Sequence, residues 1–178
     1  KGLIQLIQQE KQAALEGKPA RIIAKVNALT DPVIIRELYC ASQSGVKVDL
    51  IVRGICCLKP GVEGVSENIR VVSVIGRFLE HSRVYYFANN SYSLYCSSAD
   101  LMERNLQHRI EIAFPILRKK WVNRILEELE MYLADRQQAW ELQADGSYRK
   151  LSACVGDPVE GVQMLMLNAL STHATVSR

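Results

Sequence analysis

Apolar side chains recur along this chain with the periods of helices and of strands. Amphipathic spacing predicts helices at residues 3–16, 31–43 and 119–134, and a terminal helix is expected at 158–170. Short apolar or alternating runs predict strands at residues 21–26, 46–52, 69–75, 84–87, 93–96 and 110–116. A β-hairpin is expected at residues 140–151, with Asp145 and Gly146 at its turn. Helices and strands that alternate in this way are typical of an α/β fold.

The first two strands and the helix between them form a βαβ unit, which predicts a parallel sheet with helical cover. Thr30 is expected to cap this helix, and Pro32 suits its first turn. Ligands of such sheets bind outside the carboxyl ends of the strands. Arg53 follows the second strand directly and is therefore expected at a binding edge.

Composition adds limits to this picture. The 178 residues are 48% hydrophobic and 23% charged, so we expect one domain over residues 1–178. A net charge of +3 is too weak to imply a nucleic-acid partner and only slightly favours an anionic substrate. No apolar run reaches the roughly 20 residues of a membrane helix. The chain starts at Lys1 within a helical pattern, so we interpret it as a fragment of a longer protein.

The cysteines number five and include no CxxC motif. An odd number without paired spacing predicts neither a disulfide framework nor a zinc site. A reducing cytoplasm therefore fits best.

Residues 76–83 (GRFLEHSR) form the densest reactive stretch. If the chain is extended there, His81 and Arg83 point to the same side. An imidazole can accept or donate a proton or a phosphoryl group, and a guanidinium can stabilise the charge on phosphate oxygens. A second arginine cluster, Arg104 and Arg109, follows Ser98 and Asp100. His108 and His173 have no patterned context and are expected at the surface.

Four segments together resemble the polyphosphate kinase family. They are residues 51–61 (IVRGICCLKPG), 66–70 (SENIR), 76–83 (GRFLEHSR) and 97–105 (SSADLMERN), and they occur in the family's order. The resemblance covers nearly the whole chain and weakens after about residue 150. It implies an α/β, phospholipase-D-like domain with a mixed, largely parallel sheet covered by helices.

The same resemblance implies a function. The family reversibly transfers the terminal phosphate of ATP to inorganic polyphosphate with Mg²⁺, and two phospholipase-D-like domains meet at one active site. The phosphorylated histidine belongs to the preceding domain, so this chain alone is expected to be inactive. ATP, ADP, polyphosphate, that preceding domain and further copies of the enzyme are the implied partners, in the cytoplasm or at the membrane periphery. We expect no metal ligands in this chain, because Mg²⁺ would bind mainly through the nucleotide and the preceding domain.

The resemblance also gives residue roles. In the superfamily each half offers His-x-Lys, Asp and Gly-Ser-x-Asn. His81 matches the histidine, Arg83 replaces the lysine, and Ala88 stands where the aspartate would fall. Ser98 and Asp100 match the Ser-x-Asn element after a two-residue insertion.

Six residues are therefore expected at the site. His81 and Arg83 are the catalytic candidates, with His81 assisting transfer or holding phosphate. The expected ATP- or phosphate-binding residues are Arg53, His81, Ser98, Asp100 and Arg104, and Arg53 resembles the family's nucleotide-phosphate arginine.

Two other functions remain open at this point. A phosphodiesterase half-site would use His81 as nucleophile, and the missing aspartate and lysine disfavour it. A non-catalytic module for polyanion binding or assembly is disfavoured by the presence of both His81 and Arg53.

Overall fold

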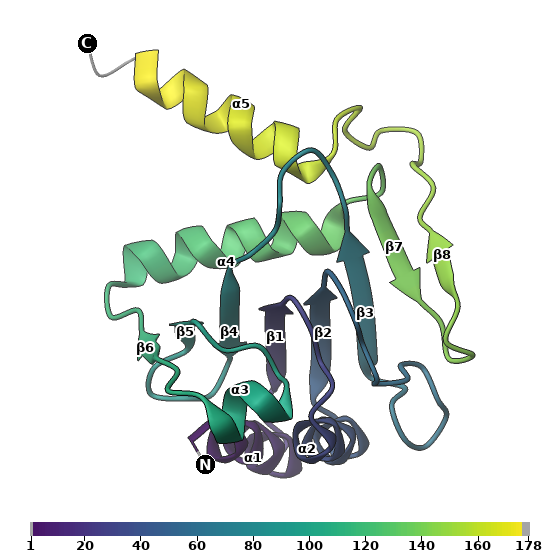
Figure 1. Ribbon diagram of the computed structural model, residues 1–178, viewed down its shortest axis with the longest axis vertical. Coiled ribbons are helices and arrows are strands. Elements are labelled where there is room, and N and C mark those ends of the chain that lie inside the picture. Colours follow the sequence, from purple (N-terminus) through teal and green to yellow (C-terminus); the bar gives the residue numbers. More distant parts are fainter. Residues whose placement is uncertain (1, 176–178) are drawn as a thin grey trace.

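The computed structural model describes residues 2–175, and their side chains as far as residue 171 (Figure 1). The helices are α1 (Gly2–Leu15), α2 (Pro32–Gln43), α3 (Glu103–His108), α4 (Lys119–Ala134) and α5 (Val162–Thr175). The strands are β1 (Arg21–Val26), β2 (Lys47–Val52), β3 (Ile69–Val74), β4 (Arg83–Phe87), β5 (Leu94–Ser97), β6 (Ala113–Pro115), β7 (Ala139–Leu142) and β8 (Tyr148–Lys150).

Within the described residues, these strands form an eight-stranded sheet in the order β6-β5-β4-β1-β2-β3-β7-β8. The mixed α/β class is confirmed, but the sheet is mostly antiparallel and not largely parallel as predicted. The pairs β1–β2 and β2–β3 are parallel, and the pairings on either side of this trio are antiparallel. Short loops at residues 88–93 and 143–147 join β4 to β5 and β7 to β8, and connections this short join antiparallel strands. The βαβ unit was therefore correctly predicted but does not represent the whole sheet.

Helices pack on both faces of the sheet, α1 and α2 on one and α4 on the other. Side chains of β1 alternate between the two faces, because successive residues of a strand point in opposite directions. Ile22, Ala24 and Val26 belong to the core formed with α1 and α2. Ile23 belongs to a second core, to which α4 contributes Leu129 among others.

Element boundaries follow the predictions where the periodicity is strong. The bounds of β1 and α4 match the predicted ranges. The predicted cap Thr30 is wrong: Asp31 caps α2, because its carboxylate accepts from the backbone N–H groups of Val33 and Ile34, both at 2.9 Å. The short helix α3 was missed, β6 is shorter than predicted, and α5 begins at Val162.

The cysteines and the apolar character of the helices bear on two further expectations from composition. The five cysteines all carry free thiols. Among the described residues, none of the helices combines the length and the apolar character needed to cross a membrane.

Candidate functional site

The carboxyl ends of β1 and β2 form the floor of the candidate site. The two strands run parallel in register, with Val26 paired to Val52, so the next residues, Asn27 and Arg53, lie at the same edge. Arg53 is half-buried, and its Nε donates to Asn27 Oδ1 at 3.2 Å. A Cβ on Gly54 would lie 2.9 Å from the Asn27 carbonyl oxygen, so glycine allows the two loops to approach this closely.

Asp100 binds the segment after β5 to the loop that follows β1. It is 7% exposed, and its Oδ1 accepts from the backbone N–H groups of Asn27 at 2.7 Å and Ala28 at 3.3 Å. Its Oδ2 accepts from Arg83 Nη2 at 2.8 Å. Burial alone would raise the pKa of Asp100, but the hydrogen bonds from Arg83 and Asn27 outweigh burial and hold it below the usual value. The carboxylate is therefore ionised at neutral pH.

Arg83 connects Asp100 to His81. Because β4 runs antiparallel to β1, its first residue lies at the carboxyl edge of β1, where Lys25 pairs with Val84. Arg83 Nη1 donates to the His81 carbonyl oxygen at 2.9 Å and lies 3.3 Å from His81 Nδ1. The His81 ring is exposed. The two predicted catalytic residues are therefore adjacent, and the guanidinium is already engaged with a carboxylate.

A buried network around Glu80, the residue before His81, was not predicted. Lys25 is 4% exposed, and its Nζ donates to Glu80 Oε2 at 2.8 Å and to Ser82 Oγ at 2.7 Å. Glu80 Oε1 accepts from Tyr132 at 2.8 Å and from Gln163 Nε2 at 2.6 Å. Burial alone would raise the pKa of Glu80, but the hydrogen bonds from Lys25 and Gln163 outweigh it and lower the pKa. A lysine inside an apolar strand was the signal that sequence reasoning overlooked.

Ser98 and Arg104 lie apart from the His81–Arg83 pair in their contacts. The Ser98 hydroxyl donates to the Glu111 carboxylate and accepts from the Ile112 N–H at 3.0 Å. Asn105 Nδ2 donates to the same carboxylate at 2.8 Å, and the hydrogen bonds from Ser98 and Asn105 lower the pKa of Glu111. Arg104 is exposed on α3, and none of the described hydrogen bonds or ion pairs joins it to the other predicted site residues.

His108 and His173 were both predicted to lie at the surface, and the structure describes the side chain of only the first. His108 is exposed, as predicted. The side chain of His173 lies outside the described residues.

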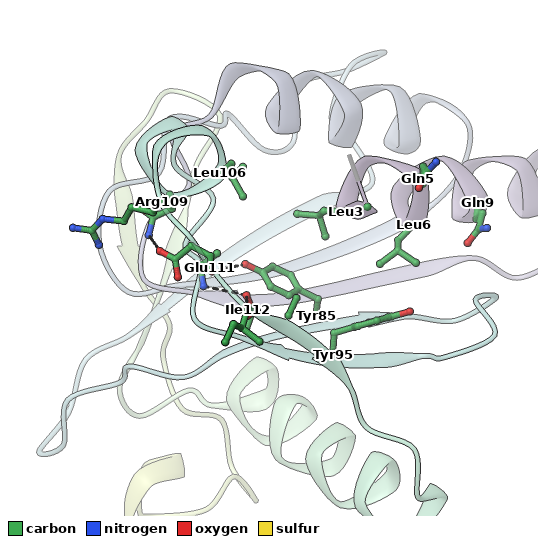
Figure 2. A pocket seen from close by; sticks show the side chains of 15 residues that line it. Leu3, Gln5, Leu6, Gln9, Tyr85, Tyr95, Leu106, Arg109, Glu111 and Ile112 are labelled. Carbon is green, nitrogen blue, oxygen red and sulfur yellow. Dashed lines mark hydrogen bonds between the residues drawn. The ribbon is translucent and has the colours of Figure 1, made fainter.

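The neighbourhood of Arg53 contains little enclosed space. A pocket of about 10 Å³ is lined by Arg53, Lys25 and Glu80 among others. A cleft of about 510 Å³ lies elsewhere, between α1 and the β4–β5 hairpin, where Figure 2 shows Tyr85 and Tyr95 below the helix. His81, Arg83 and Arg53 do not line that cleft. The large cleft is therefore separate from the edge that carries His81, Arg83 and Arg53.

Both the sequence and the fold match known proteins. The family model "Polyphosphate kinase C-terminal domain 2" matches residues 1–160. The chain is 54% identical over 179 aligned positions to a polyphosphate kinase of Pseudomonas aeruginosa, covering 100% of this chain and 26% of that relative. It therefore spans about a quarter of the length of the curated relatives it matches.

Solved structures agree with the sequence match. The crystal structure of polyphosphate kinase from Porphyromonas gingivalis superposes with a TM-score of 0.90 at 36% identity, over 97% of this chain and 26% of that one. A phospholipase D family member from Salmonella typhimurium, Nuc, superposes with a TM-score of 0.56 at 14% identity, over 79% of this chain and 90% of that one, which shows the shared fold alone. The predicted resemblance is confirmed: with a family match over residues 1–160, this chain belongs to the polyphosphate kinase C-terminal domain family and has a phospholipase-D-like fold.

Proposed function

We propose that this chain forms the C-terminal half of a polyphosphate kinase active site, which reversibly transfers the terminal phosphate of ATP to inorganic polyphosphate. One observation carries the proposal. His81 is exposed and lies between Glu80 and Arg83 in the chain, and these two residues form ion pairs of 2.8 Å with Lys25 and Asp100. An exposed ring on a fixed backbone is suited to an incoming phosphate group.

Five of the six predicted residues take roles that their contacts allow; the hydroxyl of the sixth, Ser98, already binds Glu111 and the Ile112 N–H. Arg53 has one hydrogen bond at Nε, and its guanidinium is suited to two-pronged contact with nucleotide phosphate oxygens. His81 donates a hydrogen bond to the transferring phosphate and so holds it, or it transfers a proton. Arg83 adds positive charge beside His81, and Asp100 acts through Arg83 and not by direct phosphate contact. Arg104 is an outer cation for the polyphosphate chain.

The transfer itself needs the preceding domain. We propose that an imidazole nitrogen of a histidine in that domain attacks the terminal phosphorus of ATP, while the bond to the ADP oxygen breaks. A terminal oxygen of polyphosphate then attacks the phosphohistidine and the phosphorus–nitrogen bond breaks. His81 and Arg53 would stabilise the charge on the phosphoryl oxygens in both steps. The chain alone is accordingly inactive, and the whole enzyme acts in the cytoplasm or at the membrane periphery as a homo-oligomer.

Mg²⁺ does not suit the residues of this half-site. Among the described residues, no group of three or more His, Cys, Asp or Glu side chains is placed to hold a metal ion. The carboxylates of Glu80 and Asp100 each already bind a cationic side chain. We therefore propose that Mg²⁺ arrives with the nucleotide and is held mainly by the preceding domain.

Substitution of His81 in the full-length enzyme tests the proposal. We expect His81→Ala to reduce turnover by roughly 10²–10⁴-fold, the usual range for a positioned proton-transfer group. His81→Gln should recover nucleotide binding better than turnover, since glutamine donates a hydrogen bond but cannot cycle a proton. Thermal melting should stay unchanged, because the ring is exposed.

Two results would contradict this function. Normal ATP-dependent polymer synthesis by His81→Ala would remove His81 from the chemistry. Hydrolysis of a nitrophenyl phosphodiester that depends on His81, without transfer from ATP into polymer, would favour the phosphodiesterase instead.

A further inference from the structure

Gln163, on the first turn of α5, forms hydrogen bonds to the loop that carries His81. Its Oε1 accepts from the Phe78 backbone N–H at 2.9 Å, and its Nε2 donates to the Phe78 carbonyl oxygen at 2.8 Å. The same Nε2 donates to Glu80 Oε1 at 2.6 Å. Gln163 is only 5% exposed. One buried amide therefore holds both backbone groups of one loop residue and the side chain of another.

The base of the loop is packed against this amide. A Cβ on Gly76 would lie 2.5 Å from Gln163 Oε1 and 2.9 Å from Gln138 Oε1, so a side chain there would have to displace these amides. The start of α5 is fixed in turn, because the Asp135 carboxylate at the end of α4 accepts from the Val162 N–H at 2.8 Å. The position of the amide is therefore set by α4 as well as by α5.

Apolar burial contributes little to holding the loop. Ile75 is 64% exposed, Phe78 46% and Leu79 73%. A loop with little buried apolar surface opens easily unless polar contacts fix it. The described polar contacts that do so come from Gln163, Lys25, Tyr132 and Arg83. Those of Gln163 and Tyr132 are made to Phe78 and Glu80, whereas Lys25 also binds Ser82 and Arg83 binds the His81 carbonyl oxygen.

We propose that Gln163 is a positioning residue, which holds the 76–82 loop in the conformation that presents His81 to the transferring phosphate. The inference rests on the proposed function, since the position of His81 matters only if His81 acts. Gln163 lies beyond residue 160, where the match to the family model ends. Helix α5 is thereby part of the catalytic apparatus without touching the substrate.

The test is Gln163→Met in the full-length enzyme, because methionine keeps the length of the side chain and removes all three hydrogen bonds. Turnover should fall about 10–100-fold, as for a displaced catalytic group, with little change in KM for ATP. Amide hydrogen exchange of residues 76–82 should become faster. Gln137→Met is the matched control: the Gln137 amide also binds a backbone carbonyl, that of Pro158 at 2.7 Å, but does not touch the loop. It should retain normal turnover and normal exchange in the loop.

A double-mutant cycle separates positioning from general stability. His81→Ala combined with Gln163→Met should be no slower than His81→Ala alone, because Gln163 acts through His81. Independent, multiplying losses would overturn the inference, as would unchanged turnover in Gln163→Met. A turnover loss that follows a lowered melting temperature in both glutamine variants would also overturn it. If His81→Ala itself is fully active, the proposed function fails; if His81→Ala is inactive and Gln163→Met is normal, only the role of Gln163 fails.

Discussion

The two ion pairs beside His81 are alike in distance and different in construction. In Lys25–Glu80 the cation belongs to the sheet and the carboxylate to the loop before His81. In Arg83–Asp100 the cation is the first residue of strand β4, two positions after His81, and the carboxylate comes from the segment after β5. The first pair ties a loop to the core, and the second joins the start of β4 to the segment after β5.

Their hydrogen-bond partners differ in the same way. Glu80 is bound by side chains, from β1, α4 and α5. Asp100 accepts from the backbone of Asn27 and Ala28 as well as from Arg83. Loss of Asp100 would therefore leave both a buried cation and backbone donors unpaired, whereas loss of Lys25 would leave Glu80 with two donors. The comparison predicts that the second pair matters more for stability and the first more for the order of the His81 loop.

Asp100→Ala should give the largest loss of stability. Removing one partner of a buried ion pair typically costs about 3–5 kcal/mol, because the remaining charge is uncompensated. Urea denaturation of the variant and the parent measures the difference in the free energy of unfolding. Asp145→Ala, which removes an exposed carboxylate at the β7–β8 turn, should change stability far less. Equal losses in both variants would contradict the special role of Asp100.

Lys25→Met should cost less, about 1.5–3 kcal/mol, the usual value for a hydrogen bond to a charged group. Burial would then raise the pKa of Glu80, because the main cationic partner is gone. The double variant Lys25→Met with Glu80→Gln should recover part of the stability, since no buried charge remains. Denaturation of the three variants in parallel provides the measurement, and a double variant less stable than Lys25→Met would argue against an uncompensated charge.

Arg53→Ala should affect ligand binding more than folding. Arg53 has one described side-chain hydrogen bond, to Asn27, and belongs to neither ion pair. In the full-length enzyme, loss of a charged hydrogen-bonding partner should weaken nucleotide binding by about 1.5–3 kcal/mol, or roughly 10–150-fold. Arg53→Lys should restore only part of the nucleotide affinity, because lysine cannot make a two-pronged contact. Equilibrium binding of ATP measures both, and full affinity in the lysine variant would exclude the two-pronged contact.

Acid should reduce the stability that the Lys25–Glu80 and Arg83–Asp100 ion pairs contribute, and the loss should be smallest near neutral pH. The pKa values of Glu80 and Asp100 are lowered in the folded chain, from usual values of 4.5 and 3.8. The folded state therefore binds fewer protons than the unfolded state, so the stability from each carboxylate is complete above its usual pKa. It is lost as the pH falls through the folded pKa. Stability measured from pH 7 to pH 3 should decline mainly below about pH 5. Glu80→Gln should make that decline shallower; an unchanged slope would remove Glu80 as a contributor.

Much of this protein was readable in its sequence because the signals are local. The apolar run of β1, the helical stripe of α4 and the turn at Asp145 depend on residues close together in the chain. The family resemblance also rests on contiguous segments, and it placed His81 and Arg83 together before their contacts were known. Arg83 is only two positions from His81, so their contact needs no partner from elsewhere in the chain.

The tertiary structure decided how those segments meet. The β4 and β7 strands pair antiparallel to the central trio, which strand propensity does not specify. The contacts that hold the His81 loop join Lys25 to Glu80 and Gln163 to Phe78, across 55 and 85 positions of sequence. Asp100 binds backbone N–H groups, and every residue other than proline offers the same donor. Such partners are chosen by the packing of the sheet and its helices, because only the folded chain brings them within hydrogen-bonding distance.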